Sequence, residues 1–270
     1  MERQGRLNRM VVDLEKATKI AFISENSRQK RLNRERWALE TARLYGVLVP
    51  SVIEYYVDKI DGEEREVLIL RTIQCEAPNL EKMDLNIQAM RMVGCQLSFL
   101  GPINDIGFGW PHPEYLKGEF ETWQLFLYFF VKKYGERLTK NKIISKRMLD
   151  DFLKVVMEFE FETYQAFLIH RDIKLSNILQ TREGPYIVDW ENALLGDSLF
   201  DLAQYGANYN RDELWYGLAD GFGFSEINTK YVIYEAIALI GVIDFYRKQK
   251  LDYSLKRQQL YSLFQELYIV

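Results

Sequence analysis

The chain has 270 residues, of which 48% are hydrophobic and 27% charged, and its formal net charge is −4. This length and composition allow one large buried core or two smaller ones. Nucleic acid is not expected as the main partner, because its phosphates demand clustered lysine and arginine. The basic stretch 28–36 is interrupted by Asn33 and Glu35 and is typical of the start of a solvated helix.

The cysteine content and the apolar runs indicate where the protein works. Only Cys75 and Cys95 are present, without a Cys-x-x-Cys motif, so disulfide frameworks and zinc sites are not expected. The sequence starts Met-Glu-Arg-Gln-Gly-Arg, which is too polar for a signal peptide. The apolar run 236–243 is far shorter than the roughly 20 residues of a membrane-spanning helix. We therefore expect a soluble, cytoplasmic protein without a membrane partner.

The first part of the chain carries strand patterns and one helix pattern. A helix is predicted over 28–45, because Gly46 and Pro50 follow it as helix-ending residues. Asp61-Gly62 predicts a hairpin turn between the last two strands. These patterns predict a small antiparallel sheet that carries one helix, with strands at 9–14, 19–23, 52–57 and 66–70.

After Pro78 the pattern changes to long helical periods. We expect an N-lobe over 1–73, a hinge over 74–78 and a mostly helical C-lobe over 79–270. A cleft at such a boundary is where nucleotides usually bind. The predicted helices of the second part cover 80–100, 119–134, 142–167, 225–248 and 254–267.

The segment 168–201 carries oxygen-bearing side chains in a spacing that suits phosphate transfer. Asp172 and Asn177 lie five residues apart in a predicted loop, and Asp189 follows twelve residues later, after a strand-like run at 185–188. Phosphoryl transfer needs a carboxylate that orients the attacking hydroxyl and accepts its proton, and oxygen ligands for the magnesium that neutralises the triphosphate. The three side chains follow the chain order of the kinase catalytic loop.

Structural alternatives exist for these aspartates. An aspartate in a loop is often a turn former or a helix cap, but the spacing to Asn177 and Asp189 favours catalysis for Asp172. For Asp197 we favour the structural role, because Gly-Asp-Ser also forms an ordinary loop before the helix predicted near Phe200. Asp197 therefore lies outside the predicted catalytic set.

Three motifs follow one another here: His170-Arg171-Asp172 to Asn177, Val-Asp-Trp-Glu at 188–191, and Gly-Asp-Ser-Leu-Phe-Asp-Leu-Ala at 196–203. In this order they resemble the motifs of the aminoglycoside phosphotransferase and choline kinase-like family, which shares its bilobal fold with protein kinases. The resemblance covers almost the whole chain. It implies an α+β, bilobal protein kinase-like fold with a small antiparallel-sheet N-lobe, abbreviated at its start, and a mostly helical C-lobe.

The resemblance also implies roles for individual residues. Asp172 would be the catalytic base, and Asn177 and Asp189 would bind Mg²⁺. Asp201 would brace the catalytic loop from inside the protein. The pKa of histidine, ordinarily near 6.5, would also suit a general base at His170, but the matching histidine of the family is structural.

The N-terminal part offers a partner for the phosphates. A kinase cleft needs a strand lysine for the α- and β-phosphates and a helix glutamate that holds it. Lys19 and Glu35 match the family's spacing for this pair, with Lys16, or a surface role for Lys19, as alternatives. Lys174 would contact the transferred phosphoryl group or be an exposed loop lysine. The run into the hinge resembles the family segment whose backbone would hydrogen-bond the nucleotide base: Arg71, Thr72 and Ile73.

Two departures from the family pattern bear on activity. Only residues 1–7, with a single glycine at Gly5, precede the first predicted strand, so we expect a missing strand and an incomplete phosphate-covering loop. Arg171 stands where the family usually has glycine, which gives His-Arg-Asp as in protein kinases. Only seven residues separate Asp189 from Asp197, however, so no long activation segment is present. A small-molecule kinase is therefore favoured over a protein kinase.

The predicted acceptor site lies in the helical C-terminal region together with the segment 108–123. Asp212, Glu213 and Asp220 would attract an amine, although the first two also fit the first turn of a helix. Several aromatic residues would line a pocket for a sugar or a cationic group, or would belong to the core: Trp110, Trp123, Tyr205, Tyr209, Trp215 and Tyr216.

These patterns predict a phosphotransferase that uses ATP and Mg²⁺, with GTP as an open alternative to ATP. The acceptor would be a hydroxyl of a small molecule such as an aminoglycoside, an amino alcohol or a sugar. Two other functions stay open, a non-catalytic nucleotide-binding or scaffold protein and, less favoured, a protein kinase.

Overall fold

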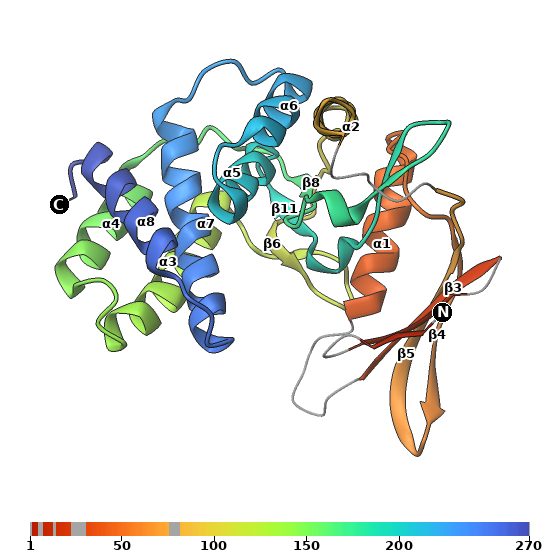
Figure 1. The fold of residues 1–270 in the computed structure, drawn as a ribbon. Helices are drawn as coiled ribbons and strands as arrows, with labels where there is room; N and C mark the ends of the chain where they lie inside the picture. The colour runs from red at the N-terminus through yellow and green to blue at the C-terminus, as the bar shows by residue number, and fades with distance from the viewer. Residues whose placement is uncertain (1, 5–7, 13–14, 23–30, 76–81, 270) are drawn as a thin grey trace.

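The computed structural model describes residues 2–4, 8–12, 15–22, 31–75 and 82–269. A twisted sheet with one helix packed on it lies at one end of the molecule, and a larger, mostly helical part lies at the other (Figure 1). Among the described residues, no helix is both long and apolar enough to cross a membrane.

The described strands at the N-terminal end form a five-stranded antiparallel sheet in the order β1-β2-β3-β5-β4. The Asp61-Gly62 turn joins β4 to β5 as predicted, and both residues have positive φ, the conformation that tight hairpins require. The strands are β1 (Glu2–Gln4), β2 (Asn8–Val12), β3 (Lys16–Phe22), β4 (Val52–Ile60) and β5 (Glu63–Arg71).

The expectation that no strand precedes residue 9 is wrong. β1 pairs antiparallel with β2, with Glu2 opposite Val11 and Gln4 opposite Arg9. Glu-Arg-Gln carries no alternation of apolar and polar residues, so no strand pattern is visible in the sequence, and the pairing rests on main-chain groups. Gly5, a candidate remnant of the phosphate-covering loop, lies outside the described residues.

Helix α1 (Arg31–Leu44) packs on one face of this sheet. Its buried residues recur at helical spacing and include Leu32, Ala38 and Leu39. The helix ends where predicted, because Gly46 adopts a positive φ and lets the chain turn back, so that the amide of Val47 reaches the carbonyl of Ala42.

The helical part is built around α7, which is buried along most of its length and packs against α3, α5 and α8. A second close contact joins α2 to α6, since a Cβ on Gly221 would lie 2.0 Å from the carbonyl of Arg91. The helices are α2 (Met83–Ser98), α3 (Trp123–Lys140), α4 (Lys146–Glu158), α5 (Leu199–Tyr209), α6 (Glu213–Phe222), α7 (Thr229–Lys248) and α8 (Ser254–Glu266).

Two predicted helix ends are wrong for reasons of packing. The predicted helix 142–167 stops at Glu158, because Phe159 and Phe161 both turn toward the core, which an extended chain allows and a helix does not. The predicted end of the preceding helix at residue 134 is also wrong. α3 runs on through Gly135 to Lys140. Because Gly135 has no side chain, Leu149 of α4 can approach the helix closely at this point.

Short strands between the two parts of the molecule carry the loops of the candidate site. The described strands include a four-stranded sheet in the order β7-β6-β11-β8 and a hairpin of β9 and β10. The predicted strand at 185–188 is confirmed as β10. Their bounds are β6 (Phe108–Pro111), β7 (Gly118–Phe120), β8 (Phe167–Ile169), β9 (Ile178–Gln180), β10 (Pro185–Ile187) and β11 (Leu194–Gly196).

The division into an N-lobe over 1–73, a hinge over 74–78 and a C-lobe over 79–270 stays a prediction. Residues 76–78 of that hinge lie outside the described residues.

Candidate active site

The loop after β8 is held from inside the protein by a carboxylate on the first turn of α5. Asp201 is 2% exposed and accepts the backbone N–H of His170 at 2.9 Å and that of Arg171 at 2.6 Å. Because one oxygen serves each amide, the carboxylate sets the direction of the chain just before Asp172.

His170 is fully buried, and both of its ring nitrogens are engaged. Nε2 lies 3.0 Å from the carbonyl of Val188, and Nδ1 accepts the backbone N–H of Asp172 at 3.1 Å. Burial lowers the pKa of His170, so the neutral ring donates from Nε2 and accepts at Nδ1. The ring packs edge-on against Trp190. It braces the loop against the segment after β10, in agreement with the structural role that the resemblance implies.

Asp172 projects a partly exposed carboxylate that two neighbours hold. Lys174 donates from Nζ to Oδ2 at 2.5 Å, and Asn177 donates from Nδ2 to the same oxygen at 3.1 Å. The Asn177 amide also donates to the Asp172 carbonyl at 2.9 Å, which closes the loop on itself. Asn177 lies in a 3-10 turn, Leu175–Asn177, and is buried, so its position is well defined.

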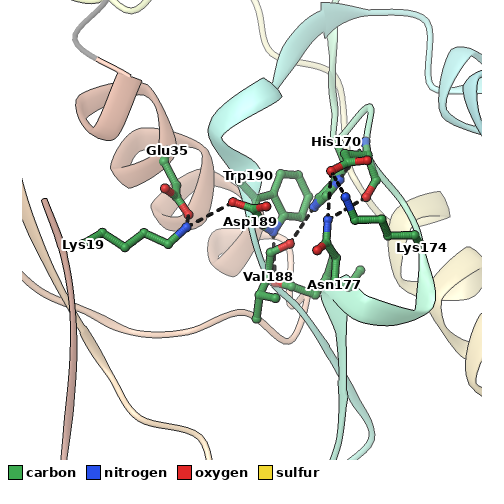
Figure 2. Close-up of polar contacts among 10 residues, drawn as sticks. Lys19, Glu35, His170, Lys174, Asn177, Val188, Asp189 and Trp190 are labelled. Atoms are coloured by element: carbon green, nitrogen blue, oxygen red, sulfur yellow. Dashed lines mark hydrogen bonds and ion pairs between the residues drawn. The ribbon is translucent and has the colours of Figure 1, made fainter. Parts of the chain in front are cut away.

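Asp189 faces this loop from the end of β10. Its backbone adopts the left-handed conformation, with φ 69° and ψ 57°, which is uncommon for a residue other than glycine and recurs at functional sites. The ammonium of Lys19 lies 3.1 Å from Asp189 Oδ1 and 2.5 Å from Glu35 Oε1 (Figure 2). The structure thus brings together Lys19, Glu35 and Asp189 from three distant segments of the chain.

The electrostatics favour a charged lysine in this triad. Burial of Lys19 would lower the pKa of its amine, but the charges and hydrogen bonds of Glu35 and Asp189 outweigh burial and raise that pKa above its ordinary value. The alternative lysine, Lys16, stands three residues earlier on the same strand and therefore on the opposite face of the sheet. Lys19 is the β3 lysine that faces α1.

Glu66 is a residue that the sequence analysis did not single out. It is fully buried on β5, accepts the backbone N–H groups of Leu32 and Asn33 at 3.3 and 2.9 Å, and accepts the hydroxyl of Tyr55 at 3.0 Å. It therefore caps the first turn of α1 from the neighbouring strand. A glutamate at an inward position of a strand whose other inward residues are Leu68 and Leu70 was the signal that could have identified it.

The predicted hinge residues line a cavity of about 790 Å³. The N–H groups of Arg71 and Thr72 are already donated to the carbonyls of Ser51 and Glu15, at 2.8 and 3.0 Å. These two N–H groups are therefore used within the protein, because backbone pairing extends one residue past β5. Contact of this segment with a nucleotide base stays a prediction. The lining comprises Ser51, Arg71, Thr72, Ile73, Gln74, Cys75, Gln180, Thr181, Arg182, Glu183 and Tyr186.

Asp197 has the structural environment that its loop pattern indicated. Its Oδ2 accepts the hydroxyls of Thr163 and Tyr234 at 2.8 and 3.0 Å and pairs with Lys230 at 2.6 Å. Its Oδ1 accepts the backbone N–H of Leu199 at the start of α5. Both oxygens are thus occupied by the surrounding protein.

The acidic candidates for an amine-bearing acceptor are mostly engaged elsewhere. Asp212 caps α6 through the N–H of Trp215, and Asp220 pairs with Arg91 at 2.7 Å. Glu213 lies in the first turn of α6, as expected. Among the aromatic candidates, Trp123, Tyr205 and Trp215 are buried, Trp110 is half-buried, and Tyr209 and Tyr216 are exposed.

The donor set fits a magnesium site of the kind that shares its metal with a nucleotide. Asn177 donates through its nitrogen, which leaves its amide oxygen as a ligand, and only one carboxylate oxygen of Asp189 is used by Lys19. Among the described residues, no group of three or more His, Cys, Asp or Glu forms a cage of its own. Mg²⁺ in nucleotide sites is typically bound by one or two such groups plus phosphate oxygens.

Comparison with known proteins agrees with this geometry. Residues 146–231, which include Asp172, Asn177, Asp189 and Asp201, match the model of the phosphotransferase enzyme family. The fold is kinase-like, as in solved structures of aminoglycoside phosphotransferase. The resemblance and the fold class predicted from the sequence are therefore confirmed.

Several solved structures have a similar fold and align with nearly the whole length of this chain. The apo form of a thermostable mutant of aminoglycoside phosphotransferase APH(4)-Ia has a TM-score of 0.71 at 14% identity, over 98% of this chain and 94% of that chain. A candidate fructosamine-3-kinase from Haemophilus somnus 129PT has a TM-score of 0.64 at 14% identity, over 97% and 89%. A choline/ethanolamine kinase family protein from Mesorhizobium loti has a TM-score of 0.62 at 19% identity, over 98% and 85%.

Proposed function

We propose that the protein is a kinase that moves the γ-phosphate of ATP to a hydroxyl of a small molecule. The observation that carries the proposal is the double ion pair of Lys19 with Glu35 and Asp189 (Figure 2), together with the Asp172 carboxylate that Lys174 and Asn177 hold on the loop after β8. A cation held in this way can place phosphate oxygens next to a carboxylate that receives a proton.

In the proposed reaction, Asp172 orients the acceptor hydroxyl and takes its proton. The hydroxyl oxygen forms a bond to the γ-phosphorus, the bond from that phosphorus to the β–γ bridging oxygen breaks, and ADP leaves. Lys174 and Asn177 hold the carboxylate in place, and Lys174 adds positive charge where the transferred group becomes more negative.

Asn177 and Asp189 would hold Mg²⁺, and Lys19, braced by Glu35, would hold the α- and β-phosphates. The metal neutralises the charge of the triphosphate when it is bound. Nucleotide use is supported by neighbours of the same fold, because a ternary complex of APH(4)-Ia holds ADP and hygromycin B and another holds AMP-PNP. Arg71, Thr72 and Ile73 would lie near the base, with Ile73 or carbonyl groups as the contacts.

A small-molecule acceptor is favoured over a protein. The seven residues between Asp189 and Asp197 are used by the 3-10 turn Trp190–Asn192 and by β11, which pairs with β8. The path holds no long loop on which a peptide could lie. The free cysteines Cys75 and Cys95 are in keeping with a reducing compartment, and the cytoplasm is part of the proposal.

The proposal is tested with Asp172→Asn, which keeps the size of the side chain and removes the base. We expect slow Mg-ATP hydrolysis, and ADP release with a panel of aminoglycosides, amino alcohols and sugars, to fall about 10²–10⁴-fold. The rise in melting temperature on adding Mg-ATP should persist.

The matched control is Asp105→Asn, which changes an exposed loop aspartate outside the site. Full turnover by the Asp172 variant would refute the assignment of the base. No thermal shift with Mg-ATP in the unaltered protein would refute nucleotide use.

A further inference from the structure

Three cations gather around one aromatic ring near the end of α7. The ring centroid of Tyr134 lies 5.6 Å from Lys133 Nζ, 5.2 Å from the guanidinium carbon of Arg137 and 5.9 Å from Lys248 Nζ. We call these four residues the Tyr134 cluster. Like charges repel, so such a gathering is stabilised when an anion lies among them.

The Tyr134 cluster continues to the catalytic loop through Trp110. The ring of Trp110 has Lys133 5.9 Å from its centroid and Arg171 5.7 Å from it. Burial lowers the pKa of Arg171, against the opposing effect of the nearby Asp201 and Asp172 carboxylates. The guanidinium of Arg171 also lies 5.8 Å from the ring centroid of Phe130 on α3, and Arg171 directly precedes Asp172 in the chain.

Tyr209 joins the same region from α5. Burial raises the pKa of the Tyr209 hydroxyl, and Lys174, Asp172 and Tyr246 also act on it. Tyr246 lies two residues before Lys248 on α7. The end of α5 therefore lies close enough to Asp172 and Lys174 for their charges to act on Tyr209.

The positive charges of this region exceed the negative charges that could balance them. Asp244 is 1% exposed and is shared by Arg137, Arg247 and Lys248, at 3.1, 2.8 and 2.8 Å. Within the described residues, no ion pair reaches Lys133 or the guanidinium of Arg171. The Nε atom of Arg171 is buried and has no hydrogen-bond partner there.

The same face of α3 extends the positive charge. Residues three and four apart on this helix border a hollow of about 550 Å³, and four of the six bear a positive charge against one carboxylate. They are Phe129, Lys132, Lys133, Glu136, Arg137 and Lys140.

Three acidic side chains of the neighbouring helices are already engaged within the protein. Asp212 and Asp220 are engaged as described above, and Glu235 pairs with Arg211 at 2.7 Å. A polycationic acceptor would meet repulsion from Lys133, Arg171 and Lys174 and would find few carboxylates to bind.

We infer that the acceptor of the proposed phosphate transfer carries a negatively charged group, a phosphate or a carboxylate, that Lys133 and Arg171 bind beside Trp110 and Tyr134. This inference rests on the proposed function and adds the chemical class of its substrate. Arg171 and Lys133 specify the acceptor, and Asp172 receives the proton of its hydroxyl.

The test uses the full chain saturated with Mg-ADP and compares matched ligands by calorimetry. Glucose is compared with glucose 6-phosphate and gluconate, glycerol with glycerol 3-phosphate and glycerate, and hygromycin B serves as the polycation. We expect a phosphorylated or carboxylated member of each set to bind at least about tenfold more tightly than its neutral parent, as one charge-assisted contact provides. The phosphate and carboxylate arms then show which anion is preferred.

Lys133→Gln should remove most of that preference while leaving the thermal shift with Mg-ATP unchanged. The matched control is Lys154→Gln, an exposed lysine on α4. Tighter binding of hygromycin B than of every anion, no difference between anionic and neutral ligands, or an unchanged preference in Lys133→Gln would overturn the inference. If Mg-ATP does not raise the melting temperature of the unaltered protein, the proposed function is refuted instead.

Discussion

The two sides of the candidate site use positive charge in opposite ways. On the sheet side, a single ammonium, Lys19, is held by two carboxylates, Glu35 and Asp189. On the helical side, Asp244 pairs with Arg137 and Lys248 of the Tyr134 cluster, whereas Lys133 and Arg171 have no ion pair within the described residues. A cation with two partners has a fixed position and suits chemistry that tolerates little movement. A surplus of cations has no internal partner and suits recognition of a ligand.

Among changes to the cations of the two sides, the largest effect is expected from removing Lys19, which two carboxylates hold. Lys19→Met leaves Glu35 buried without its partner, so we expect the free energy of unfolding to fall by about 3 kcal/mol. The value of kcat/KM for Mg-ATP should fall by about 10²–10³-fold as well. Denaturant unfolding and steady-state kinetics measure both.

Lys16→Met is the control for Lys19→Met, since it changes a lysine on the opposite face of the same strand. Similar losses in both variants would mean that the two faces are equivalent, and the assignment of Lys19 would be lost.

The next prediction concerns the anchoring of α1, the helix that carries Glu35. Glu66→Ala removes the cap on the first turn of α1 and should lower the free energy of unfolding by about 1–2 kcal/mol. KM for Mg-ATP should rise severalfold, because Glu35 no longer has a fixed position. Glu66→Gln keeps an acceptor oxygen and should restore part of this loss.

Tyr55→Phe removes one hydrogen bond to the same carboxylate without touching the helix. If KM for Mg-ATP in Glu66→Ala equals that in Tyr55→Phe, Glu66 serves packing alone and does not position Glu35.

The pH dependence of stability tests the role of His170, which holds the loop after β8 against the segment after β10. Burial lowers the pKa of His170, so the folded state binds its proton less readily than the unfolded chain, whose histidine pKa is about 6.5. The contribution of the neutral ring is complete above about pH 6.5 and is lost as the pH falls below it. Thermal unfolding between pH 5 and 8 should show this loss. His170→Asn should change this pH profile and His112→Gln should leave it unchanged. The difference between the two variants isolates the ring of His170, because Asp201, whose pKa burial raises to about 7, contributes with the opposite sign in the same range.

The smallest expected effect compares Lys248, which pairs with Asp244, with Lys133, which has no ion pair within the described residues. Asp244 already pairs with Lys248, so we expect Lys248→Gln to weaken binding of the preferred anionic ligand only about two- to fivefold. Lys133→Gln should have the larger effect. Calorimetry of both variants with the same ligand decides the order, and the reverse order would contradict the charge imbalance at Lys133.

Local patterns were sufficient for much of the molecule. The Asp61-Gly62 turn, the end of α1 before Gly46 and the strand β10 follow from residue type and spacing, because turns and helix ends depend on a few neighbouring residues. The ends of α3 at Lys140 and of α4 at Glu158 could not be predicted, since Gly135 and Phe161 respond to packing partners on other elements.

By itself, the sequence indicated the kinase-like fold through the resemblance of its motifs. It also determined the chain order of Asp172, Asn177 and Asp189, because these residues lie in a short segment with characteristic spacing. Only the tertiary structure decided that Lys19 reaches Glu35 and Asp189 at once, and that Glu66 caps α1. It also decided that cations from α3, α7 and the catalytic loop surround Tyr134 and Trp110. These contacts join residues far apart in the chain, and their geometry depends on how the sheet and the helices pack.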